Sequence, residues 1–116
     1  MGTYSIDNNG NMCYYSSMRV IARSTLITFY SRPDCLDAKL PLDTWYHEAK
    51  RGNWKSWADI KEQYGSASVL KNSRVVFNIG GNKYRLVVAI NYPAQVIYIR
   101  FVGTHKEYDR INAEEI

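Results

Sequence analysis

Apolar and polar residues alternate along three runs in the second half of the chain, at 74–79, 83–92 and 96–102. A period of two is typical of β-strands, because successive side chains point to opposite faces. The turn signals Gly80-Gly81-Asn82 and Pro93 separate the runs, which predicts an antiparallel sheet. One face of this sheet is expected to be wholly apolar, with Val75, Phe77, Ile79, Tyr84, Leu86, Val88, Ile90, Tyr92, Ile97, Ile99 and Phe101.

The opposite face of the same sheet is predicted to be cationic and to face water. It should carry Arg74, Asn78, Lys83, Arg85, Tyr98 and Arg100, with Lys71 just before the first strand. No Asp or Glu occurs from Gln63 to Lys106, so these cations have no counter-charge in the local sequence. Such a surface favours a polyanionic partner. The alternative interpretation is a solvated basic face without a specific role.

The residues before this sheet predict a short strand and then helices. The strand is expected at 18–22, and a helix at 25–31 with Ser24 as its N-cap. A second helix should follow Pro41 and end at Arg51-Gly52.

A third helix is predicted to open at Ser56, where Ser56-Trp57-Ala58-Asp59 resembles a capping box, and to end near Tyr64. Its Trp57, Ile60 and Tyr64 share one face, and we expect them to pack in the core. These patterns predict an α+β domain over 18–116, in which N-terminal helices pack against an antiparallel sheet of three to four strands. Residues 1–17 show neither period and are expected to form a flexible arm.

Length and composition indicate a single globular domain. The chain has 116 residues, 46% of them hydrophobic, and a net charge of +4 that favours anionic partners. Cys13 and Cys35 have no further cysteine pair and no histidine at ligand spacing, so reduced thiols are expected rather than a zinc site. Neither a membrane span nor a secretory signal is recognisable, which predicts a cytoplasmic protein.

Metal-free cleavage of RNA is a reaction that the cationic face could support. The 2′-hydroxyl attacks the adjacent phosphorus, which requires a base, an acid and fixed cations around the phosphorane. His105 follows the last strand and can exchange protons, Arg85 and Arg100 suit phosphate contacts, and Lys106 and Tyr108 lie beside the histidine in sequence. A single histidine in such a place is more often structural, so that interpretation stays open. No motif for a metal, a nucleophile elbow or a phosphate-binding glycine loop is present, and no cofactor is expected.

Two motifs, at 76–87 (VFNIGGNKYRLV) and 98–109 (YIRFVGTHKEYD), resemble HigB-type toxins of the RelE superfamily. Ala67-Ser68-Val69 and Trp54-Lys55-Ser56 fit as well, and the resemblance covers about 18–110. It implies a curved antiparallel sheet packed on helices, and a ribosome-dependent endoribonuclease that cuts translated mRNA. It also implies a cognate HigA-like antitoxin with a helix-turn-helix domain, held with the toxin in a hetero-oligomer.

The resemblance also assigns roles to individual residues. Arg85 matches a phosphate or transition-state contact, His105 falls where relatives have a catalytic Arg or His, and Tyr108 lies near their functional aromatic. The chain departs from the RelE type at Val76 and Asn78, where that type carries lysines, so His105 is expected to take over work done there by lysine. A non-catalytic module that binds RNA or the ribosome is the alternative function. The sequence does not decide which group is the general base and which the general acid.

Overall fold

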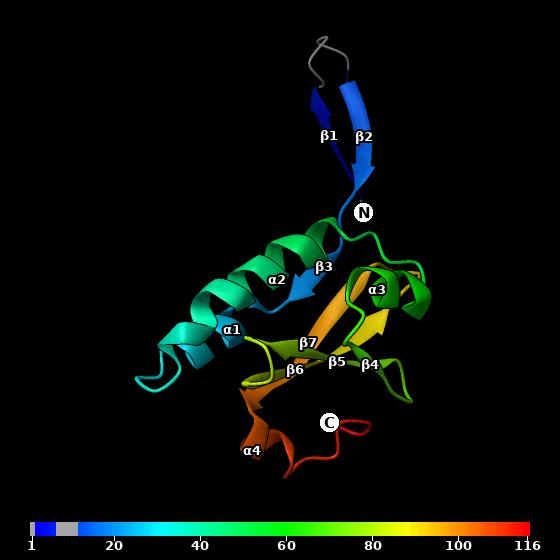
Figure 1. The fold of residues 1–116 in the computed structure, drawn as a ribbon. Helices are drawn as coiled ribbons and strands as arrows, with labels where there is room; N and C mark the ends of the chain where they lie inside the picture. Colours follow the sequence, from blue (N-terminus) through cyan, green and yellow to red (C-terminus); the bar gives the residue numbers. More distant parts are fainter. Residues whose placement is uncertain (1, 7–11) are drawn as a thin grey trace.

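The computed structural model describes residues 2–6 and 12–116. It contains both the helices and the strands that the sequence pattern predicts (Figure 1). Five strands form one sheet in the order β3-β7-β6-β5-β4: β3 (Arg19–Ile21), β4 (Ser68–Val69), β5 (Arg74–Ile79), β6 (Tyr84–Asn91) and β7 (Val96–Thr104). The predicted α+β class is confirmed, with one strand more than expected and with β3 parallel to β7 rather than antiparallel. Gly80 and Gly81 have φ values of +62° and +70°, which suits the tight turn between β5 and β6.

The helices cover one face of this sheet. They are α1 (Arg23–Tyr30), the short 3₁₀ helix η1 (Leu36–Ala38), α2 (Lys39–Arg51) and α3 (Trp57–Gln63). Figure 1 shows them on one side of the sheet, with α4 (His105–Tyr108) and the C-terminal segment on the other. Phe77 lies at the centre of the main core, where its ring packs against Trp45, Trp54 and Tyr64 at centroid distances of 5.4, 5.9 and 5.2 Å.

A β-bulge in β7 overturns part of the predicted alternation. Val88 pairs with Ile99 and Val87 with Phe101, so Arg100 is the extra residue between the two pairs. From that point the faces are exchanged: Val102 packs on the main core, whereas Phe101 packs on the opposite face. The placement of Phe101 on the helix-covered face was therefore wrong.

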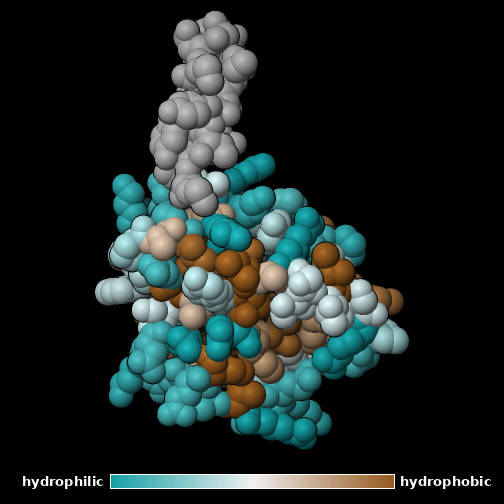
Figure 2. All heavy atoms as spheres, turned by 180° about the vertical axis from the view of Figure 1, so that it is seen from behind, coloured by the Kyte–Doolittle hydropathy of each residue, from teal (hydrophilic) through white to brown (hydrophobic). Residues whose placement is uncertain are grey.

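The face opposite the helices is not wholly polar. Val76, Val87 and Ala113 are buried there and form a second, smaller cluster with the half-buried Leu70, Phe101, Tyr108, Ile111 and Ile116. Most of the partners come from residues 108–116, which fold back over the middle of the sheet. Seen from behind, the molecule shows apolar side chains at its surface, surrounded by hydrophilic ones (Figure 2). The prediction of a water-facing, cationic face holds only outside this covered area.

Four local predictions differ from the structure. The second helix begins at Lys39, before Pro41 rather than after it. The first helix begins at Arg23, and neither its N-cap Ala22 nor Ser56 before α3 makes a side-chain cap hydrogen bond. Instead, the Asp59 carboxylate accepts a hydrogen bond from the backbone N–H of Lys55 at 2.9 Å. Trp57 is 57% exposed rather than packed in the core, because α3 directs Ile60 inward.

The N-terminal arm contains two strands that its sequence did not predict. β1 (Gly2–Ile6) and β2 (Met12–Ser16) pair in antiparallel fashion, while residues 1 and 7–11 lie outside the described part. Figure 1 shows this hairpin projecting from the sheet and helices. The search for periodicity therefore missed these two strands, and the flexibility of the arm stays a prediction. Among the described residues, every helix is too short or too polar to cross a bilayer.

Candidate functional site

One end of the sheet brings together several of the predicted site residues. Arg85 on β6 pairs with Asn78 on β5 and with Gly103 on β7, and all three lie on the face opposite the helices. The backbone N–H of His105 donates to the carbonyl oxygen of Lys83 at 3.3 Å, which ties the start of α4 to the same end. Asn78, Arg85 and the α4 residues His105, Lys106 and Tyr108 therefore surround one corner of the sheet, which we call the α4 corner.

The short helix α4 is fixed at this corner by a capping box. The Thr104 hydroxyl accepts a hydrogen bond from the Glu107 N–H at 3.2 Å, and the Glu107 carboxylate accepts one from the Thr104 N–H at 3.0 Å. Glu107 also binds Arg32 from the helical layer at 3.2 Å. The Thr104 N–H and the Arg32 guanidinium lower the pKa of Glu107. A Thr-x-x-Glu pattern is a recognised helix start, and could have marked this contact in the sequence.

His105 contacts an acid that sequence reasoning missed. Its Nδ1 lies 3.2 Å from an oxygen of Asp109, one helical turn later, and the two side chains are 55% and 61% exposed. A proton on Nδ1 facing this carboxylate leaves Nε2 as the basic nitrogen. The spacing of four residues could have suggested the pair. The arrangement orients a proton acceptor that is open to a ligand.

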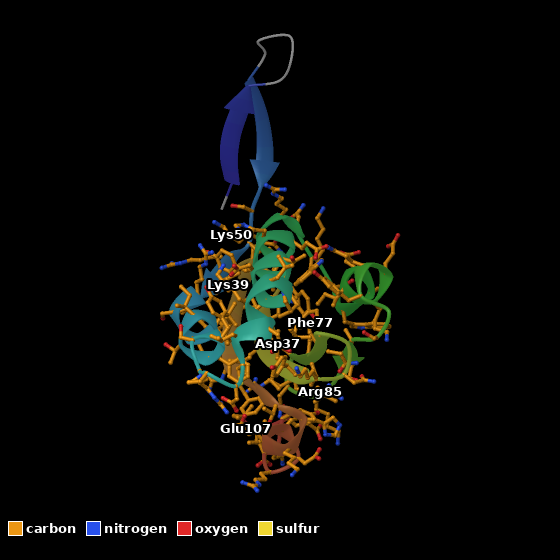
Figure 3. The ribbon with its side chains drawn as sticks, turned by 60° about the vertical axis from the view of Figure 1, so that its left-hand side comes forward. Asp37, Lys39, Lys50, Phe77, Arg85 and Glu107 are labelled. Atoms are coloured by element: carbon orange, nitrogen blue, oxygen red, sulfur yellow. The ribbon has the colours of Figure 1, made fainter. Side chains whose placement is uncertain are left out.

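Arg85 is anchored on one side only. Its Nη1 donates to the carbonyl oxygens of Asn82 and Tyr84 at 3.0 and 3.2 Å. Within the described part of the chain no acceptor contacts its Nε or Nη2, so these two groups can donate to a phosphate. Figure 3 shows Arg85 and Glu107 at the same end of the sheet, on β6 and α4.

Tyr108 and Lys106 differ in their surroundings. The Tyr108 ring packs near that of Phe101, with centroids 6.5 Å apart, and is half-buried. Phe101 in turn lies over Gly103, where an added Cβ would come within 2.5 Å of the ring. Lys106 is exposed. The α4 corner thus combines a packed aromatic ring, that of Tyr108, with the solvent-exposed ammonium group of Lys106.

The side chain of Lys83, predicted to lie on the cationic face, contacts the helical layer instead. Its ammonium forms an ion pair with Asp37 from η1, and Asp37 also accepts a hydrogen bond from the Tyr84 hydroxyl. The Lys83 bond, and then that of Tyr84, lower the pKa of Asp37. Asp37 lies 46 residues away in sequence, so local composition could not reveal this counter-charge.

Arg74 and Arg100 are also set apart from the α4 corner. Both donate to the main-chain oxygen of Ile116, Arg74 at 3.1 and 2.6 Å and Arg100 at 3.2 Å. Lys71 is exposed in the turn before Arg74, and Tyr98 is 39% exposed on β7. The predicted RNA-binding residues are therefore dispersed. Asn78 lies at the α4 corner, whereas Arg74 and Arg100 contact the chain's own C-terminal segment.

Hollows of the described surface also lie away from the α4 corner. Two of them, of about 570 and 520 Å³, share Gly52 and Gln63 at the junction of α2 and α3. Neither is lined by any of the predicted site residues. The described residues also include no cluster of three or more His, Cys, Asp or Glu that could hold a metal ion.

Comparison with known proteins defines the class. Residues 38–111 match the model of a family described as HigB_toxin, RelE-like toxic component of a toxin-antitoxin system. The match spans more than half of the chain and includes both motifs and the α4 corner, so the chain belongs to this family.

Individual relatives agree with this assignment. The chain is 38% identical over 65 residues to the mRNA interferase toxin HigB of Escherichia coli strain K12. The same values are found for the mRNA interferase HigB of Escherichia coli O157:H7 and for that of Shigella flexneri. The aligned region covers 54% of this chain and 62% of each relative, so the chain spans less than two thirds of their length.

Proposed function

We propose that this protein is the toxin of a type II toxin–antitoxin system and an endoribonuclease that cleaves translated mRNA on the ribosome. The observation that carries the proposal is the α4 corner, where Arg85 meets the helix that bears His105, in a chain of this toxin family. Three relatives are named mRNA interferases, which supports the same activity.

In the proposed reaction the 2′-oxygen attacks the neighbouring phosphorus. Nε2 of His105 accepts the proton of the 2′-hydroxyl, the new O2′–P bond forms, and the P–O5′ bond breaks. The products are a 2′,3′-cyclic phosphate and a 5′-hydroxyl, whose proton comes from Lys106 or Tyr108. The free N–H groups of Arg85 stabilise the charge that develops on the phosphorane oxygens. No metal ion takes part in this scheme.

Partners follow from the family description. A toxic component of a toxin–antitoxin system requires an antitoxin, and we expect a HigA-like helix-turn-helix protein that forms a hetero-oligomer with this chain. The substrate is expected to be mRNA bound to the ribosome in the cytoplasm. Asn78 and the basic residues Lys71, Arg74 and Arg100 would then contact the RNA backbone.

Matched pairs of variants test the catalytic assignment. His105→Ala and Arg85→Ala should each abolish growth arrest and lower mRNA cleavage by about a hundredfold or more. His47→Ala and Arg51→Ala remove the same side chains from the exposed surface of α2 and should leave both unchanged. Primer extension on cellular mRNA after induced expression measures cleavage, and circular dichroism checks the fold.

Two results would contradict this mechanism. Cleavage that stops in EDTA would require a metal ion, and cleavage that survives both substitutions would move the chemistry away from the α4 corner.

A variant that arrests growth through ribosome binding while transcripts stay intact would favour the second candidate, a non-catalytic RNA-binding module. The exposure of His105, at 55%, is the observation that favours this candidate, because active-site bases are usually more enclosed. That module would show steep salt dependence without strand scission.

A further inference from the structure

The C-terminal residues form a turn held by its own hydrogen bonds, and this turn packs on the sheet. The N–H groups of Glu115 and Ile116 both donate to the Asn112 carbonyl oxygen at 3.1 Å, and the Asn112 side chain accepts from the Glu114 N–H at 3.1 Å. This turn, residues 112–116, is here called the tail turn. It is attached to the sheet by Asn72, whose amide donates to the Glu114 carbonyl oxygen at 3.0 Å.

Three N–H groups from two arginines converge on a single oxygen of the tail turn. Nε and Nη2 of Arg74 and Nε of Arg100 lie 3.1, 2.6 and 3.2 Å from the Ile116 main-chain oxygen. Two guanidinium groups aimed at one oxygen suit an anionic oxygen, such as that of a phosphate. The chain itself occupies what is chemically an oxyanion site.

The apolar attachment of the tail turn is small. Only Ala113 of this turn is buried, against Val76 and Val87, while Ile116 is half-buried. Glu114 and Glu115 add two acidic groups to the turn that contacts the arginines, which opposes the approach of a second anion. The family match ends at residue 111, so the tail turn lies outside the part shared with that family model.

We propose that the tail turn is an intramolecular competitor of RNA, and that Arg74 and Arg100 form a phosphate-binding site that opens when the turn detaches. A phosphate oxygen of the bound strand then takes the place of the Ile116 oxygen. The inference rests on the proposed function for the identity of the anion as RNA. The measured affinity for RNA is then proportional to the fraction of molecules in which the turn is open.

A truncated chain that ends at Asn112 tests this directly. Removal of 113–116 should lower the Kd for a short single-stranded RNA of mixed sequence by about tenfold, the ratio expected when the open form is populated to roughly 10%. The gain should vanish when Arg74→Ala and Arg100→Ala are combined with the truncation, since the freed site is then absent. An unchanged Kd, or a gain that persists without the arginines, would overturn the proposal.

A cross-linked variant covers the case in which the truncated chain fails to fold. Asn72→Cys with Glu114→Cys, in a Cys13→Ser background, places two thiols where the amide meets the tail turn. The oxidised form should bind the same RNA about tenfold more weakly than the reduced form, and equal affinities would reject the competition.

Cleavage of mRNA by the same variants separates this inference from the proposed function. Normal cleavage with no change in Kd would reject the competition by the tail turn and leave the proposed function standing. A tenfold change in Kd in a protein that never cuts mRNA would reject the nuclease activity and leave the competition standing.

Discussion

The two faces of the sheet are built from the same strands but are covered in different ways. On one face, here called the helix face, the helical layer buries Phe77 and the rest of the main core. On the other, here called the tail face, the segment 108–116 packs on a smaller cluster around Val76 and Val87, and arginines flank this area. A large buried area fixes the fold, whereas a small one can open at low cost in free energy. The difference indicates that most of the stability resides on the helix face.

Deletion of a ring on each face gives the largest expected contrast. Phe77→Ala should lower the free energy of unfolding by about 3 to 5 kcal/mol, because it opens a cavity among three aromatic rings. Phe101→Ala removes the same atoms from a half-buried position and should cost about 1 to 2 kcal/mol. Urea unfolding curves measure both. Equal losses would mean that the tail face carries as much of the core as the helix face.

Gly103→Ala should perturb the tail face alone. The added Cβ would lie 2.5 Å from the Phe101 ring and 3.2 Å from Glu107 Cβ, so the ring must move. We expect a loss of about 1 to 3 kcal/mol in stability and a loss of activity, because the ring supports Tyr108. Gly65→Ala is the matched control, since an added Cβ there meets nothing within 4 Å. Thermal melts and a cleavage assay on both variants would show whether the close approach matters.

The link between the two layers through Glu107 should have the smallest effect, and one that depends on pH. Its pKa is lowered in the folded state, so its bonds to Thr104 and Arg32 add stability above the ordinary Glu pKa of about 4.3. This contribution is lost as the pH falls through the lowered value. Glu107→Gln should cost less than about 1 kcal/mol at pH 7, because the pair is partly exposed. The gap between the two proteins should close as the pH falls through the lowered pKa of Glu107, and a gap that widens in acid would contradict the assigned ion pair.

The sequence predicted much of the fold because alternation is a strong local signal. The strand bounds, the turn at Gly80-Gly81 and the apolar face through Ile99 all follow from consecutive residues. The same signal failed at Phe101, since a bulge adds one residue to β7 without any mark in the hydrophobic pattern. The α4 corner was predicted in part, because Asp109 and Glu107 were missed although both lie at helical spacing. Its other residues were named: Asn78, Arg85, His105, Lys106 and Tyr108.

By itself the sequence determined which residues alternate, that a long stretch contains cations without acids, and that two motifs resemble one toxin family. Only the tertiary structure decided which of these cations are available. Asp37 neutralises Lys83, and the tail turn engages Arg74 and Arg100, whereas Arg85 keeps two free donor groups within the described residues. The physical reason is that periodicity depends on neighbours along the chain, while counter-charges and covering segments come from residues that only folding brings near.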